Sequence, residues 1–196
     1  PAPRLNEKPS LASKLLQHLS GTADTQNGAS PTPTPNLTCQ PCAMRPFFRG
    51  KALRQGRYSA AGNVYMITAV TACRHPVFDN FLCARCAIKA IRDSDIQDFS
   101  NTYAFVVMPD HLHWLFQLGT EETLSRVVQR VKSQITREIR RQADSVVQIW
   151  QAGFHDHAMR TDEHLVDTAR YIVANPLRAG LCRSVCEYPH WDCVWV

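Results

Sequence analysis

Hydrophobic and polar residues alternate in several short segments of the chain. From Val64 to Ala72 the run VYMITAVTA has the period of two and the β-forming residues that predict a strand. Segments 101–108 and 112–118 have the same character, and the Pro-Asp pair between them suits a tight turn, so they predict a hairpin. A further strand is expected within 149–159.

Other segments place apolar residues three and four positions apart, which predicts amphipathic helices. These segments span 78–92, 121–141 and 162–174, and Pro176 and Gly180 end the last one. The order is then strand, helix, strand, strand, helix, strand, helix. It predicts an α+β fold in which helices pack on a mostly antiparallel sheet of the ferredoxin-like type.

The composition changes near residue 45. Residues 1–45 hold most of the prolines and many Ser and Thr residues, and they carry too few apolar side chains to form a core. We therefore expect a flexible, disordered leader over 1–45 and one folded domain over 46–196. A single domain also suits a chain of 196 residues that is 44% hydrophobic.

Charge and hydropathy narrow the range of partners. Lys and Arg number 22 against 17 acidic residues, and the net charge of +5 fits a polyanionic partner without requiring one. No apolar run approaches the roughly 18 residues that span a bilayer, and the start of the chain lacks the pattern of a secretory signal. The expectation is a soluble, cytoplasmic protein with no membrane partner.

Eight cysteines are many for such a protein, and two pairs have CxxC spacing. Cys39 and Cys42 lie in the Pro-rich stretch, and Cys83 and Cys86 lie inside a predicted helix. A structural zinc site needs tight turns at its ligand pairs, which a helix does not supply. We favour reduced thiols packed as small hydrophobic side chains.

Two histidines in the segment MPDHLHWLF carry the first candidate chemistry. Alternate residues of a strand share a face, so His111 and His113 point the same way while Leu112, Trp114 and Phe116 point into the core. Imidazole is a common metal ligand, and two on a rigid strand supply part of a metal site. The alternative is a pair of solvent-exposed strand histidines.

The predicted helix over 162–174 carries a tyrosine on its polar side. Leu165, Ala169 and Ile172 lie on the apolar stripe, and Tyr171 projects away from it. Asn175 follows one turn later, where its amide oxygen could approach the same metal as the histidines. The alternative is a tyrosine at the edge of the core with its hydroxyl in water.

A metal and a tyrosine together make phosphoryl transfer plausible. A phenol is a poor nucleophile at neutral pH, and a nearby divalent cation offsets this by stabilising charge on the phosphate under attack. Attack on a DNA phosphodiester would leave a phosphotyrosine and a free sugar hydroxyl, so the same step could run backward. Cutting and joining would then be one reaction.

The predicted helix over 121–141 is basic on one side. Arg126, Arg130 and Arg137 form a stripe, together with Arg141, opposite the apolar face of that helix. Such a stripe suits contact with DNA phosphates, although solvated basic faces are common. Lys132 lies off the stripe and is also a candidate for contact with DNA.

Taken together, these pieces resemble the single-tyrosine transposases of the HUH endonuclease superfamily, and most closely the REP-associated tyrosine transposases. The resemblance covers about Leu53 to Trp191. It rests on the ordered segments GRYSAAGNVYMITAVTACRHPVF, YAFVVMPDHLHWLF, VKSQITREI, IWQAGFHDHAMR and YIVANPLRAGL.

The resemblance implies that 46–196 is an HUH-type transposase catalytic domain with Mg²⁺ or Mn²⁺ as cofactor. Tyr171 would be the nucleophile, His111 and His113 metal ligands, and Asn175 the third ligand. The substrate would be a hairpin cleaved beside its stem as single-stranded DNA, by a monomer or a homodimer. We add Arg57 and Tyr58 as candidates for reading unpaired bases.

Two rival functions remain at this stage. One is a DNA-binding regulator that keeps the fold and does not cut. The other is a metal phosphoesterase that uses water in place of Tyr171. The presence of the whole residue set favours the strand transferase.

Overall fold

The computed structural model describes residues 59–142, 148–160 and 164–195. The predicted leader over 1–45 lies outside these described residues. So do Arg57 and Tyr58, the candidates for contact with unpaired bases. Within the described ranges, no helix is long and apolar enough to cross a membrane.

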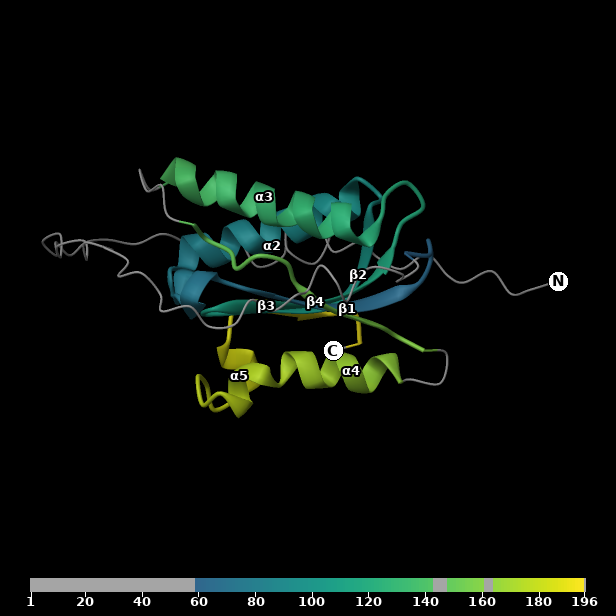
Figure 1. The fold of residues 1–196 in the computed structure, drawn as a ribbon. Coiled ribbons are helices and arrows are strands. Elements are labelled where there is room, and N and C mark those ends of the chain that lie inside the picture. The colour runs from purple at the N-terminus through teal and green to yellow at the C-terminus, as the bar shows by residue number, and fades with distance from the viewer. Residues whose placement is uncertain (1–58, 143–147, 161–163, 196) are drawn as a thin grey trace, which may run out of the picture. The chain divides into compact units, whose positions relative to one another are not determined.

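The described part of the chain is built on one sheet with the strand order β4-β1-β3-β2-β5, and every neighbouring pair is antiparallel (Figure 1). The first four strands have the order of a ferredoxin-like sheet, with a helix after β1 and another after β3. The predicted α+β class and its ferredoxin-like sheet are therefore confirmed. The strands are β1 (Val64–Val70), β2 (Ser100–Met108), β3 (His111–Leu118), β4 (His155–Ala158) and β5 (Trp191–Cys193).

Helices cover both faces of the sheet. The long helices α2 (Phe81–Ile96) and α3 (Leu124–Gln142) lie on one face, and α4 (Leu165–Val173) and α5 (Asn175–Arg178) lie on the other (Figure 1). Three short 3-10 turns complete the described elements. They are η3 (Ala72–Arg74), η4 (Val77–Asp79) and η5 (Val185–Glu187).

The alternation along β3 decides which side chains meet which helices. Leu112, Trp114 and Phe116 belong to the larger hydrophobic core with α2 and α3, as the sequence predicts. Leu115 points the other way, into a smaller core that contains Ala169 of α4. Because both faces are covered, the second part of β2, residues 103–108, is a continuous apolar run and not an alternating one.

The ends of all three predicted helices differ from the prediction by up to four residues. The first begins at Phe81, because the Asn80 side chain accepts hydrogen bonds from the backbone N–H groups of Leu82 (2.9 Å) and Cys83 (3.2 Å) and so caps it. Pro176 does not only end a helix. It lies in the first turn of α5, where its missing N–H has no helical partner to lose.

Two of the cysteines behave as small core residues. Cys86 and Cys193 are buried, whereas Cys73 and Cys186 are exposed, so the prediction of packed thiols holds for part of the described set. Burial raises the pKa of the Cys86 thiol, which favours its neutral form.

Candidate active site

The two histidines of β3 lie side by side on the sheet face that α4 covers. His111 and His113 alternate with the side chains that enter the larger core, and the next residue in their row, Leu115, packs with Ala169 and Ile172 of α4. The centroids of the two imidazole rings are 4.8 Å apart and the rings meet edge to face at 85°. The predicted convergence of the two side chains is confirmed.

Each imidazole is held through its Nδ1 atom. The Nδ1 of His111 lies 2.5 Å from Asp110 Oδ1, and the Nδ1 of His113 lies 2.8 Å from the hydroxyl oxygen of Thr68 on β1. The second oxygen of Asp110 accepts a hydrogen bond from Arg74 at 2.8 Å. Hydrogen bonds of this kind fix the orientation of histidines that bind metals through the other ring nitrogen. The arrangement leaves Nε2 of both rings for a ligand.

Electrostatics favour neutral His113 and charged Asp110. Burial and, after it, the neighbouring His111 lower the pKa of His113 to about 4, although Asp110 acts in the opposite direction. Burial alone would raise the pKa of Asp110, but the hydrogen bonds and charges of His111 and Arg74 outweigh it and lower that pKa. A neutral imidazole is the form that binds a metal ion.

Tyr171 lies on the outer side of α4. Ala169, Ile172 and Val173 hold this helix against the sheet, while the Tyr171 side chain is 45% exposed. Its ring packs against the guanidinium of Arg178 from α5, at 4.8 Å from the ring centroid. The predicted division of α4 into an apolar and a polar side is confirmed, and the helix that carries the phenol covers the face that carries the histidines.

Asn175 links α4 to α5 at the end of the tyrosine helix. Its amide nitrogen donates hydrogen bonds to the backbone oxygens of Tyr171 (2.9 Å) and Ile172 (3.1 Å). Both N–H groups are thereby used, so its side-chain oxygen is the atom that remains to accept or to bind a cation.

The two imidazole nitrogens suit a divalent transition metal, and an amide oxygen is the type of ligand that suits Mg²⁺ or Mn²⁺. No group of three or more His, Cys, Asp or Glu side chains that could hold a metal occurs among residues 59–142, 148–160 and 164–195. The amide oxygen of Asn175 is a donor of another type, and its role as a third ligand beside His111 and His113 stays a prediction.

The arginine stripe of α3 lies on the other side of the sheet from the histidines. Arg126 and Arg130 both contact Glu122, at 3.1 Å and 2.7 Å. The apolar face predicted for the opposite side of α3 is buried, through Leu124, Val127, Val128, Val131, Ile135 and Ile139. These arginines and Arg137 line one groove. Their contact with DNA stays a prediction, and the structure places them away from the histidine pair.

Lys132, on the same helix, makes contacts within the protein. Its ammonium donates to the backbone oxygens of Gln151 (3.1 Å) and Gly153 (2.7 Å) and lies 5.3 Å from the centre of the Trp150 ring. These contacts hold the segment before β4 against α3. The contact of Lys132 with DNA stays a prediction. Its hydrogen bonds to the two backbone oxygens already give this lysine a role in stabilising the fold.

The sequence reasoning missed the residues that support the histidines. Asp110 entered it only as part of a turn, although it directly precedes His111 in the segment PDHLH. Thr68 could not be found from the sequence, because only the register of β1 against β3 places it opposite His113.

The description "Transposase IS200 like" belongs to a protein family whose sequence model matches residues 60–175, more than half of the chain. That range begins before β1 and ends at Asn175, so it includes both histidines and Tyr171. The chain belongs to the family of IS200-like transposases.

Two curated proteins that are similar to this chain have a more specific name than the family. REP-associated tyrosine transposase of Escherichia coli K12 is 32% identical over 88 residues, which are 44% of this chain and 50% of that protein. A Haemophilus influenzae protein provisionally named as a REP-associated tyrosine transposase is 30% identical over 99 residues, 45% of this chain and 56% of that protein. The chain thus spans about half the length of the curated relatives it matches.

A solved structure has the same fold. It is that of a REP-associated tyrosine transposase bound to a REP hairpin, and it superposes with a TM-score of 0.55 and 26% sequence identity over 69% of this chain and 79% of that one. The resemblance stated from the sequence motifs is therefore confirmed at the level of the family and the fold.

Proposed function

We propose that this protein is a DNA strand transferase that nicks and rejoins single-stranded DNA beside a hairpin, with Tyr171 as the nucleophile. The observation that carries the proposal is the placement of His111 and His113 on the sheet face covered by α4, the helix of Tyr171. Membership of a transposase family and a similar fold in a protein bound to a REP hairpin support it.

In the proposed reaction the phenol oxygen of Tyr171 forms a bond to phosphorus, and the bond from phosphorus to one sugar oxygen breaks. The phenol loses its proton, and the departing sugar oxygen takes one up as a hydroxyl. The phosphotyrosine keeps an ester bond of similar energy, so a sugar hydroxyl can attack it and restore the DNA. Nicking and rejoining are then the two directions of one exchange.

His111, His113 and Asn175 would hold Mg²⁺ or Mn²⁺, which when bound supplies positive charge to the phosphate under attack. Asp110 and Thr68 keep the two imidazoles oriented through their Nδ1 atoms. Arg178, whose guanidinium lies over the ring of Tyr171, adds a positive charge beside the phenol.

The test is the formation of a covalent protein–DNA adduct. The protein would be incubated with Mn²⁺ and an end-labelled DNA hairpin that carries single-stranded extensions, and the products separated under denaturing conditions. We expect a labelled adduct that Tyr171→Phe abolishes while binding to the hairpin is nearly unchanged. Tyr103→Phe, which removes the hydroxyl of a half-buried tyrosine of β2, is the matched control and should leave the adduct in place.

Two other results would each select a rival. Cleavage that survives Tyr171→Phe would mean that water attacks the phosphate, as in a phosphoesterase. Hairpin binding with no cleavage by the unmodified protein would mean a regulator that has the fold without the reaction.

A further inference from the structure

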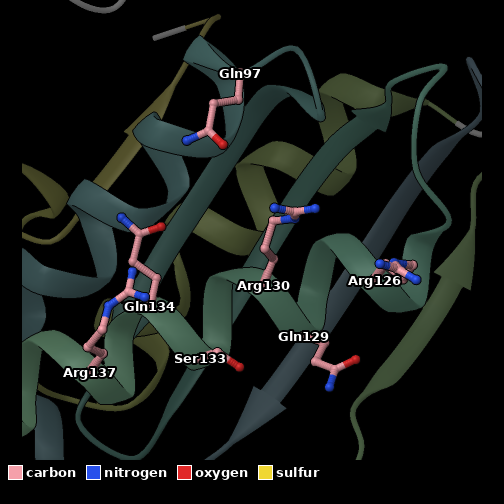
Figure 2. Close-up of a pocket in the computed structure, with 7 residues that line it drawn as sticks. All are labelled: Gln97, Arg126, Gln129, Arg130, Ser133, Gln134 and Arg137. Carbon is pink, nitrogen blue, oxygen red and sulfur yellow. The ribbon is translucent and has the colours of Figure 1, made fainter.

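A polar groove runs along α3 on the side of the sheet that faces away from Tyr171. Its volume is about 550 Å³. Figure 2 shows Arg130, Gln134 and Arg137 projecting from α3 toward the side where Gln97 lies, at the end of α2. The seven lining residues are Gln97, Arg126, Gln129, Arg130, Ser133, Gln134 and Arg137.

The groove is positively charged and its side chains are held in place. Three guanidinium groups stand against two nearby carboxylates, that of Glu122, which Arg126 and Arg130 share, and that of Asp93 on α2. The guanidinium of Arg130 also lies 4.6 Å from the centre of the Phe99 ring. Gln134 donates a hydrogen bond of 2.6 Å to Asp93 of α2. Side chains that are already fixed lose little freedom when they bind a phosphate.

The lining chemistry suits the backbone of DNA. Arginine, glutamine and serine side chains are among the groups that contact phosphate and sugar oxygens. Among the residues the structure describes, those that line the groove include no aromatic side chain. Unpaired bases are usually held by stacking on aromatic rings, so a paired segment, whose bases are stacked on each other, fits the groove better.

The length of the groove suits several base pairs. Arg126 and Arg137 are 11 residues apart on α3, which at about 1.5 Å per residue is roughly 16 Å. Double-stranded DNA advances about 3.4 Å per base pair, so this length corresponds to about five base-pair steps. The groove lies across the sheet from His111 and Tyr171, and a backbone bound there belongs to a different part of the DNA from the phosphate under attack.

We propose that this groove binds the sugar-phosphate backbone of the double-stranded stem of the hairpin, while the unpaired strand beside the stem enters the histidine site. This assignment rests on the proposed function for its substrate. It gives the protein two separate DNA contacts, of which only the one at the sheet face of α4 takes part in the exchange. The stem contact would read no bases and would fix where the cleaved strand emerges.

The test uses the full chain with Tyr171→Phe, so that binding is measured without cleavage. Two variants each remove two positive charges from exposed helix positions. Arg126→Gln with Arg137→Gln alters the groove, and Arg85→Gln with Lys89→Gln on α2 is the control, because neither residue lines the groove. The probes are a labelled hairpin with a stem of about 12 base pairs, longer than the contact length, and the unpaired extension alone.

For the groove variant we expect weaker binding of the hairpin and a plot of log affinity against log salt whose slope is smaller by about 2, since each lost phosphate contact removes about 0.9. Binding of the unpaired extension should stay the same, as should hairpin binding by the control variant. Equal losses for hairpin and extension would overturn the assignment to the stem. A groove variant that binds the hairpin like the control would overturn the site itself.

The result is separable from the test of the proposed function. If the unmodified protein formed no covalent adduct, the strand-transfer reaction would be wrong, and a weaker hairpin contact in the groove variant would still stand as a DNA-binding site. If the adduct formed with a normal yield and the groove variant bound normally, the reaction would stand and the groove would not.

Discussion

Replacing Asp110 by Asn would change only one group beside His111. Each oxygen of the carboxylate has its own partner, Oδ1 the Nδ1 of His111 and Oδ2 the guanidinium of Arg74. Asparagine offers one oxygen and one NH₂ group. A guanidinium can only donate, so Arg74 selects the amide oxygen and the NH₂ group turns toward His111. The Nδ1 atom must then accept, and the imidazole proton moves to Nε2.

The expected cost follows from the role of that Nε2 atom. A protonated Nε2 cannot bind a metal, so the variant loses the orientation that the carboxylate imposes. Loss of such a partner weakens metal binding by about 10- to 100-fold, or about 1.4 to 2.7 kcal/mol. The backbone at this turn should not move, because Thr71 donates to the Asp110 backbone oxygen through its N–H and its hydroxyl, both at 2.9 Å.

The assay is a calorimetric titration of Mn²⁺ into the Tyr171→Phe protein, with and without Asp110→Asn. Asp79→Asn, at an exposed carboxylate outside the site, is the matched control and should bind Mn²⁺ like the parent. Adding Arg74→Ala to Asp110→Asn should recover part of the affinity, because the amide is then free to turn its oxygen toward His111. Unchanged affinity in Asp110→Asn, or no recovery in the double variant, would refute the reasoning.

The remaining predictions concern the ligand, the subunit and the core. Asn175→Ala should weaken Mn²⁺ binding in the same titration while hairpin binding is kept, and equal Mn²⁺ affinity would remove this residue from the site. Mixing Tyr171→Phe with His111→Ala protein should form no adduct, because α4 packs on the sheet of its own chain; recovered adduct would mean that the tyrosine serves a second subunit. Burial raises the pKa of Asp95 from 3.8 to about 6. Between pH 3.8 and pH 6 the folded protein therefore binds a proton that the unfolded chain has lost. Its contribution to stability is present below pH 3.8 and is lost as the pH rises through about 6, a change of about 3 kcal/mol at most. Asp95→Asn should remove this loss. Urea unfolding of both proteins at pH 4 and pH 7 is the test, and the assignment is wrong if the variant loses as much stability between the two pH values as the parent does.

Periodicity was sufficient to predict most of the fold. The strands around His111 and the two long helices follow repeats that extend over many residues, and the ends of these elements differ from prediction by a few positions. β5 was not predicted, because it has only three residues and forms by pairing with residues 104–106 of β2. A strand this short has no period to detect.

The histidine pair and the tyrosine were predictable for different reasons. The spacing of His111 and His113 determines a shared face once the segment is a strand. That Tyr171 belongs to the same face of the sheet is a property of the chain path, and in the sequence it came only from the family resemblance. The partners of the imidazoles required the register between strands, which pairs Thr68 with His113.

The position of Tyr171, the proposed nucleophile, depends on a few small contacts. The histidines proposed as ligands lie on β3, which is bonded to a neighbouring strand on each side and packed on both faces. Tyr171 lies on α4, a helix of nine residues, too short to be stable in isolation. Its order comes from Ala169, Ile172 and Val173 packing in the smaller core. The two histidines are therefore fixed by the sheet, whereas the phenol is fixed only as firmly as that core holds α4. The proposed strand transferase would have to release one DNA end and accept another at the same phosphotyrosine, and rigid histidines beside a more weakly held tyrosine suit that exchange.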